Sequence, residues 1–440
     1  MALPPRYDSI KAYLEDALDF LKDYHWLYST PNTHILVNTV FERFPCEWLM
    51  FLKDLSAEQL NSLSSGSLPD NAPPSLEDFF RKVERLSCTL QKTGDESSKY
   101  AKNSGLSRKK EHEIVCLAPI IHDICEKSGC DFVVDVGTGL GYLPRFLYER
   151  YKYRILGIEG CSEKIKLAKI HQTKYPESSD CIKYFEHFVT EDSEQQIKEV
   201  LDNVPMKHAC ITGLHACADL SVTILEIFAK LDVAKSMVIM PCCYHRLKQN
   251  ERGFENFPKS KLLGLVVGER EALDFLNVPF LRLACQSSGD GFARMTEVER
   301  EAHTNGCLFR AILQDVAEAE HYQVRRLKRK SGKFKPSPEI SEPFETYLTN
   351  LKHTHVLIGG EITDRQFLTK MREKWTQHKG KAYLIGALAA FQAAMQNICE
   401  NVVLLDRVMF LKEKGVECFV VKVTDQGISP RCHALVAVKP

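Results

Sequence analysis

The residues best suited to bind a ligand form the run Asp135–Gly141, which reads Asp-Val-Gly-Thr-Gly-Leu-Gly after an apolar segment, 132–136. Alternate glycines let backbone amides approach a ligand, because no side chain blocks them, and the start of the following helix favours a negative group. A dinucleotide fingerprint needs its third glycine at position 142, where this chain has Tyr142. The spacing therefore predicts a nucleotide-like ligand other than NAD.

A second acid, Glu159, ends the next expected strand, 154–159. A carboxylate at this point can accept hydrogen bonds from both hydroxyls of a ribose. The turn with its flanking acids favours S-adenosylmethionine, and the alternative is a glycine turn that only packs a helix against a strand. The predicted cofactor residues are Asp135, Gly137, Gly139, Gly141 and Glu159.

Two further acids, Glu191 and Asp192, follow the third expected strand, 182–189. They are candidates to face the adenine amine of the cofactor. Acids at such a position can equally cap the next helix. Both interpretations stay open.

Cysteines and histidines follow two neighbouring strands of the expected sheet: His215 and Cys217 after the fourth, and Cys242, Cys243 and His245 after the fifth. Ligands of such sheets bind beyond the carboxyl ends of the strands. We therefore expect both segments to reach the pocket in which chemistry takes place.

This cluster has three interpretations. Histidine titrates near neutral pH, so His215 or His245 can serve as a general base, with Cys242 and Cys243 as further catalytic candidates. Two thiolates and two imidazoles also suit zinc, but the usual CxxC pair is missing, and we assign no metal ligand. In the third interpretation, the cysteines are small buried side chains and the histidines have their hydrogen bonds satisfied within the protein, so that both only pack the strand ends.

The elements that position these residues alternate between helix and strand, which is typical of a parallel sheet covered on both faces. The expected strands are 132–136, 154–159, 182–189, 209–214 and 237–241. The expected helices are 107–124, capped by Ser107, then 141–151, 162–171, 195–202 and 220–231. A long helix, 382–411, leads to two segments, 417–423 and 434–438, that read as an antiparallel pair closing the sheet.

We thus predict an α/β fold: a Rossmann-like methyltransferase sheet with a helical N-terminal cap and a large insertion after the fifth strand. The predicted segments are a helical region at 1–100, the first part of the core at 105–241, the insertion at 242–380, and the last helix with the terminal hairpin at 381–440.

Composition limits the partners and the compartment. The 58 basic residues balance the 58 acidic ones, so net charge selects no class of partner. Sixteen scattered cysteines without a CxxC pair indicate reduced thiols, and hence the cytoplasm or the nucleus. The start of the chain lacks the pattern of a secretory signal, and the longest apolar stretch, 382–395, is shorter than the ~20 residues that span a bilayer. We expect a soluble protein without membrane contact.

The chain resembles the methyltransferase-like protein 25 family, which includes proteins described as ribosomal RNA adenine dimethylase domain-containing. The resemblance rests on the runs Gly105–Glu113, Asp135–Leu143, Gly213–Leu220, Cys242–His245, Leu281–Gln286 and Ser429–Arg431. It implies a methyltransferase fold with Gly137, Gly139, Gly141 and Glu159 in the cofactor positions. The run Cys242–His245 also resembles a Cys-Cys-His-His run of tRNA 2′-O-methyltransferases, and it departs from that run at Tyr244.

A basic run in the insertion is the candidate contact for RNA. It contains Arg325, Arg326, Lys328, Arg329, Lys330, Lys333 and Lys335, and no acid. Such a run neutralises phosphates irrespective of base sequence, but it can equally be a solvated loop or a localisation signal.

The function we expect is methyl transfer from S-adenosylmethionine to an unidentified acceptor, with RNA as the candidate. No Asn-Pro-Pro-Tyr or Asp-Pro-Pro-Tyr run follows the fourth strand, which argues against methylation of an adenine amine. The alternative is a catalytically silent cofactor-binding protein that acts as a partner-binding module.

Overall fold

The chain divides into two compact units in the computed structural model, which describes residues 3–88, 90, 93, 106–251, 253–268, 274–286, 292–327 and 342–440. Unit 1 comprises Met1–Lys22, Arg85–Ser288 and Gln396–Pro440, and unit 2 comprises Asp23–Glu84 and Gly289–Met395. The helical region predicted at 1–100 and the insertion predicted at 242–380 therefore each contribute to both units.

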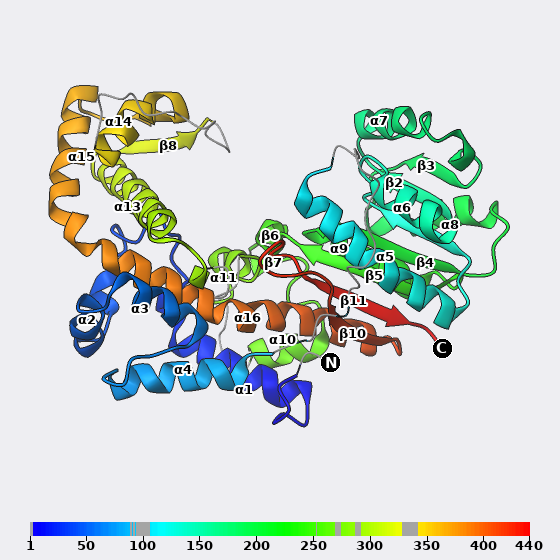
Figure 1. Ribbon diagram of the computed structural model, residues 1–440, viewed down its shortest axis with the longest axis horizontal. Helices are drawn as coiled ribbons and strands as arrows, with labels where there is room; N and C mark the ends of the chain where they lie inside the picture. Colours follow the sequence, from blue (N-terminus) through cyan, green and yellow to red (C-terminus); the bar gives the residue numbers. More distant parts are fainter. Residues whose placement is uncertain are drawn as a thin grey trace. The chain divides into compact units, whose positions relative to one another are not determined.

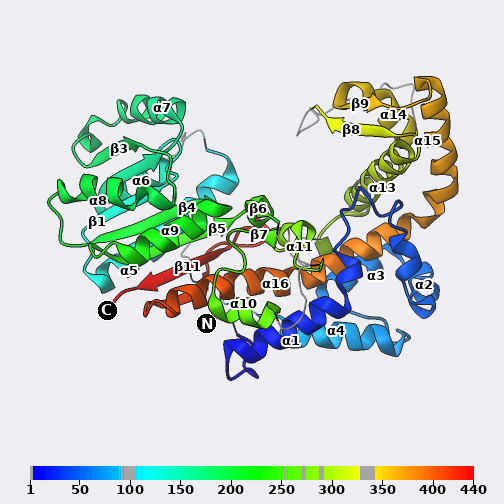
Figure 2. The same ribbon diagram turned by 180° about the vertical axis from the view of Figure 1, so that it is seen from behind.

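Unit 1 contains a seven-stranded sheet in the order β10-β11-β5-β4-β1-β2-β3, which Figure 2 shows with β11 beside β5. Strands β1 to β5 pair in parallel, and β11 lies antiparallel to both β5 and β10. Their bounds are β1 Phe132–Val136, β2 Arg154–Glu159, β3 Ile182–Glu186, β4 Ala209–Cys217, β5 Ala234–Cys242, β10 Glu417–Lys422 and β11 His433–Val438. The predicted α/β fold with its closing hairpin is confirmed.

Helices cover both faces of this sheet (Figure 1). All five residues of β1 are buried, as expected for a strand covered on both sides. In the sheet, β2 and β3 lie on one side of β1, and β4 and β5 lie on the other. Because connections between parallel strands are right-handed, the helices after β1 and β2 lie on one face of the sheet and the helix after β4 lies on the other. The helices are α5 Arg108–Ser128, α6 Tyr142–Tyr151, α7 Ser162–Gln172, α8 Glu194–Asp202 and α9 Asp219–Lys230.

The predicted N-cap of the first of these helices is confirmed, because the Ser107 hydroxyl accepts a hydrogen bond from the Lys110 amide. Apolar side chains of α5, such as Ile121, then pack in one cluster with the sheet and with Phe146 of α6. This packing fixes the polar start of α5 near the carboxyl ends of the strands.

Three strand ends differ from the prediction. β4 continues past a register shift between Gly213 and Ala216, and Cys217 still pairs with Cys242. His215 and Cys217 therefore belong to β4, and Cys242 is the last residue of β5, instead of following these strands as predicted. β3 ends at Glu186, three residues earlier than expected.

Other helices of unit 1 come from distant parts of the chain. They are most of α1 Ile10–Asp23, then α10 Lys261–Gly268, α11 Val278–Leu283 and the C-terminal half of α16 Ala382–Lys412. A buried ion pair fixes α16 to the sheet, because Glu400 Oε2 lies 3.2 Å from Nδ1 of His433 in β11. A short hairpin, β6 Gln249–Asn250 and β7 Gly253–Phe254, follows β5.

Unit 2 is largely helical. It contains α2 Cys46–Lys53, α3 Ala57–Ser62, most of α4 Pro74–Leu86, then α13 Glu297–Ala319, α14 Pro343–Thr354, α15 Asp364–His378 and the first half of α16, with one antiparallel pair, β8 Tyr322–Arg326 and β9 His355–Gly359. Its core includes Trp48 and Phe79, whose rings lie 5.4 and 5.5 Å from the ring of Phe391.

One continuous helical run among the described residues, Asp364–Lys412, is long and apolar enough by composition to cross a membrane. However, 78% of its apolar window is buried inside the protein. This burial is the behaviour of a core helix.

Candidate cofactor and acceptor site

The glycine turn joins the end of β1 to the start of α6, and its three glycines all have positive φ: 75° at Gly137, 60° at Gly139 and 76° at Gly141. The amides of Gly137 and Thr138 donate to the carbonyl of Ile158 at 2.8 and 3.0 Å, which fastens the turn to β2. L-residues with a Cβ rarely adopt this backbone conformation, so the turn requires glycine.

Steric demands differ between the glycines. A Cβ at Gly141 would overlap the hydroxyl of Tyr184 and lie 3.0 Å from the ring carbon Cζ. A Cβ at Gly139 would meet only the carbonyl oxygen of Gly137, at 4.0 Å. Gly141 therefore accommodates a neighbour in the fold, whereas Gly139 faces open space that a ligand can occupy.

Glu159 closes the turn from the end of β2. It is 8% exposed, and its Oε2 accepts a hydrogen bond from the Gly139 amide at 3.0 Å. Its Oε1 accepts from the Cys161 amide at 3.1 Å and from Lys164 Nζ at 3.3 Å. The structure thus brings together the glycine turn and the acid that the sequence assigned to the ribose.

Asp135 lies beneath the turn with only 2% of its surface exposed. Burial raises the pKa of Asp135 to about 6, and the charge of Glu159 adds to this rise, while Thr138 and Lys110 oppose it. Burial lowers the pKa of Lys110, and the negative groups that oppose this shift are Glu113, Asp135, Cys242 and Cys217. The glycine turn follows β1, and the cysteines lie at the ends of the neighbouring strands β4 and β5, so both lie at the carboxyl edge of the sheet.

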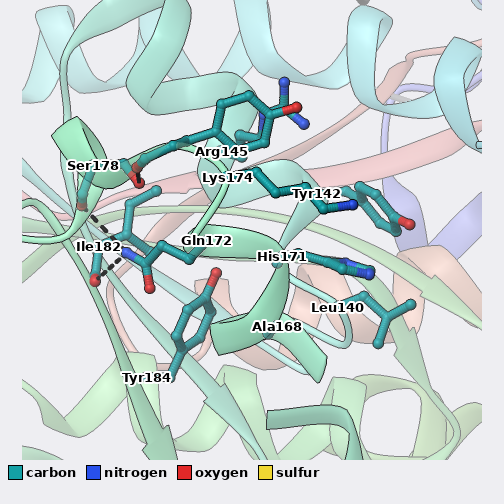
Figure 3. A pocket seen from close by; sticks show the side chains of 12 residues that line it. Leu140, Tyr142, Arg145, Ala168, His171, Gln172, Lys174, Ser178, Ile182 and Tyr184 are labelled. Atoms are coloured by element: carbon teal, nitrogen blue, oxygen red, sulfur yellow. Dashed lines mark hydrogen bonds between the residues drawn. The ribbon is translucent and has the colours of Figure 1, made fainter. Parts of the chain in front are cut away.

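A separate cavity of about 90 Å³ opens behind the turn, between α6, α7 and β3 (Figure 3). Arg145 stacks over the ring of Tyr175 at 3.3 Å, and Gln172 Nε2 donates to the carbonyls of Ser178 and Ile182. We expect the cofactor on the other side of the turn, where Gly139 faces open space.

His215 forms an oriented pair with a carboxylate that the sequence interpretation missed. Its Nε2 lies 3.0 Å from Oε2 of Glu113, which is 1% exposed, and the other carboxylate oxygen accepts a hydrogen bond from Ser429 at 2.7 Å. Burial would raise the pKa of Glu113, but hydrogen bonds from His215 and Ser429 and the charge of Lys109 leave that pKa below its usual value. Glu113 thus remains an anion that orients the imidazole.

The thiols of Cys217, Cys242 and Cys243 converge at the ends of β4 and β5, all within 4.8 Å of one another. Arg431 Nη2 lies 3.7 Å from the sulfur of Cys243. Hydrogen bonds from Cys217 and Cys242, with the charge of Arg431, hold the pKa of Cys243 well below its usual range. Hydrogen bonding to the other two thiols raises the pKa of Cys242.

His245 lies in the 3₁₀ turn Tyr244–Arg246 after β5, and its Nδ1 contacts Cys285 Sγ at 3.1 Å. Burial lowers the pKa of His245, and the positive charge of Arg282 lowers it further. His245 therefore pairs with a cysteine that the sequence interpretation did not assign to the site.

The remaining predicted residues lie elsewhere. Glu191 and Asp192 are exposed in a 3₁₀ turn before α8, whose capping bonds come from Thr190 and Ser193 instead of from the two acids. Arg325 and Arg326 are exposed on β8 in unit 2. The other predicted RNA contacts, Lys328, Arg329, Lys330, Lys333 and Lys335, lie outside the described residues.

The residues missed by sequence reasoning are Lys110, Glu113, Cys285, Ser429 and Arg431. Each lies inside a run on which the family resemblance rests, so those runs carried the signal. Gly105, at the head of the first run, lies outside the described residues.

Comparisons with known proteins identify the domain. Residues 109–250 match the family model described as a methyltransferase domain. "Probable methyltransferase-like protein 25" of Mus musculus is 25% identical over 263 residues, which cover 57% of this chain and 40% of that protein. The Homo sapiens protein of the same name is 26% identical over 267 residues, with the same coverage. The chain thus matches 40% of the length of these relatives.

Among solved structures, the plantazolicin methyltransferase BamL covers 75% of this chain and 92% of its own, with 14% identity and a TM-score of 0.23. The match to coclaurine N-methyltransferase covers 98% of this chain and 88% of that protein, with 10% identity and a TM-score of 0.23. The family match confirms a methyltransferase domain at 109–250, whose cofactor is S-adenosylmethionine.

Proposed function

We propose that this protein transfers the methyl group of S-adenosylmethionine to an acceptor, as a member of the methyltransferase-like protein 25 family. The observation that carries the proposal is the buried Glu159 carboxylate, bonded to the Gly139 amide beside open space. A carboxylate at this position suits ribose hydroxyls, and the amides at the start of α6 suit the carboxylate of the cofactor.

His215 is the general base in this proposal. When its Nε2–H donates to Glu113, the neutral imidazole keeps Nδ1 as an acceptor for a proton. The cofactor supplies a methyl group on a sulfonium, whose leaving electron pair stays on sulfur. His215 takes the proton of the attacking oxygen or nitrogen while Glu113 stabilises the imidazolium that results.

RNA is the acceptor class that we propose. Support comes from the exposed pair Arg325 and Arg326, which belong to the basic run, and from the likeness of Cys242–His245 to a run of tRNA 2′-O-methyltransferases. We do not propose dimethylation of adenine, because β4 ends in His-Ala-Cys, without the motif that holds an exocyclic amine.

The test is incubation of the purified protein with labelled S-adenosylmethionine and fractionated cell extract. We expect label in RNA, and Glu113→Gln should reduce methyl transfer about 100-fold while cofactor binding stays unchanged. His215→Asn should likewise reduce methyl transfer, because the proposed general base is removed. His353→Asn, at an exposed position of α14, is the matched control. Label in the protein fraction alone would overturn the RNA proposal. Cofactor binding without transfer to any fraction would identify a silent cofactor-binding protein.

A further inference from the structure

Three thiols meet at one point of unit 1, although they come from two separate segments of the chain. Cys217 and Cys242 are partners in the register of β4 and β5, and their sulfurs lie 3.1 Å apart. Cys243 follows with φ 55°, so the chain turns back and brings its sulfur to within 4.8 Å of the other two.

We propose that Cys217, Cys242 and Cys243 bind one zinc ion as three thiolates. Zinc binds thiolates at about 2.3 Å in tetrahedral geometry, which places sulfurs about 3.8 Å apart. The three sulfurs need to move by only about 1 Å to reach this spacing. Soft thiolate ligands favour zinc over magnesium or calcium.

Backbone strain at Cys243 supports a bound ligand. A left-handed backbone at a residue with a side chain costs about 1 kcal/mol or more, and such residues concentrate at ligand sites. Without this turn, consecutive residues at the end of β5 would point to opposite faces of the sheet. The strained turn is what makes Cys243 an additional ligand beside Cys242.

Charge around the cluster suits this ion. Three thiolates and one Zn²⁺ carry a net negative charge, and the guanidinium of Arg431 lies 3.7 Å from Cys243 Sγ to compensate it. The Nε of Arg431 is buried and has no hydrogen-bond partner among the described residues. A guanidinium in this state still has a donor to offer to a thiolate or to a group bound on the metal.

The fourth position of the ion stays open in this proposal. His245, two residues after Cys243, has its Nδ1 engaged with Cys285. Three protein ligands with one exchangeable position are typical of catalytic zinc sites, whereas structural sites have four. An open position at the carboxyl ends of β4 and β5 can take water or an atom of the acceptor.

Metal binding can be measured without methyl transfer, so its outcome is independent of the proposed function. The protein is purified with a reductant and no chelator, and its zinc content is determined by mass spectrometry. We expect about one zinc per chain. After removal of zinc, titration with Co²⁺ should give thiolate-to-cobalt charge-transfer absorption and the visible bands of a tetrahedral ion.

Single variants identify the ligands. Cys217→Ser, Cys242→Ser and Cys243→Ser should each weaken Co²⁺ binding by at least about tenfold. Cys181→Ser is the matched control, because this cysteine is also partly buried but lies before β3, at the opposite side of the sheet. Equal weakening by the control would overturn the assignment.

A second measurement on the unmodified chain covers the case in which a serine variant fails to fold. Zinc should protect Cys217, Cys242 and Cys243 from alkylation by iodoacetamide and leave Cys181 reactive, as read from peptide masses. The proposal fails if zinc gives no protection. It also fails if the reduced protein binds no Co²⁺ and the cluster only forms a Cys217–Cys242 disulfide on oxidation.

Discussion

Replacement of Gly141 by alanine is expected to lower the free energy of unfolding by about 2–5 kcal/mol. The first contribution is the backbone, because φ 76° costs a residue with a Cβ about 1–2 kcal/mol. The second is overpacking of about 1–3 kcal/mol, because the new methyl overlaps the hydroxyl of Tyr184 and lies 3.0 Å from its Cζ.

Gly139→Ala is the matched control. Its φ is 60°, but the added Cβ meets only one atom, at 4.0 Å, so we expect the backbone cost of about 1–2 kcal/mol alone. Urea unfolding without cofactor, followed by circular dichroism, measures both variants. Adding Tyr184→Phe to Gly141→Ala should restore about 1 kcal/mol, because the hydroxyl is removed while Cζ stays. Equal stability of the two alanine variants would refute the steric argument.

Three further predictions concern charge. Glu159→Gln should raise the dissociation constant of S-adenosylmethionine about 10–100-fold, as measured by calorimetry, because hydrogen bonds to a charged acceptor are lost. The control is Glu163→Gln at the exposed start of α7, which should leave the dissociation constant unchanged. Asp135 has a pKa of about 6 in the folded protein and 3.8 in the unfolded chain. Because the unfolded chain releases this proton at lower pH, the contribution of Asp135 to stability falls as pH rises from 4 to 6. That fall, up to ~3 kcal/mol, should be absent from urea unfolding of Asp135→Asn. Burial would lower the pKa of His433, but Glu400 outweighs it and raises the pKa to about 10. The contribution of His433 to stability should therefore be full below pH 6.5 and decline toward pH 10 in thermal melts, and His433→Gln should lack this decline.

The sheet could be predicted because its strands are continuous apolar runs that alternate with helices, and parallel strands buried on both faces leave this pattern. The residues at which the strands end could not be predicted in this way. β4 was expected to stop at Leu214, because His215 and Cys217 look polar beside the preceding run, yet pairing with β5 resumes after the register shift at Gly213. Pairing between strands, which no local pattern records, decides where such a strand ends.

The cofactor half of the site was also accessible from the sequence, because Gly139 and Glu159 belong to one βαβ unit and meet through local geometry. The acceptor half was not. Glu113 lies 102 residues before its partner His215, and Ser429 lies 316 residues after Glu113. Only the packing of α5 and the last strands against the sheet brings these groups together.

The negative charge beneath the glycine turn has a consequence for cofactor binding. Burial and the charge of Glu159 disfavour ionisation of Asp135, while Lys110 offsets this only in part. A cationic sulfonium bound near the turn favours the ionised form of Asp135, so its affinity should rise between pH 5 and pH 7, through the pKa of about 6. Calorimetric titration with S-adenosylmethionine across this range measures the slope. The slope should be lost in Asp135→Asn, and a wild-type affinity independent of pH would show that the cation does not interact with this carboxylate.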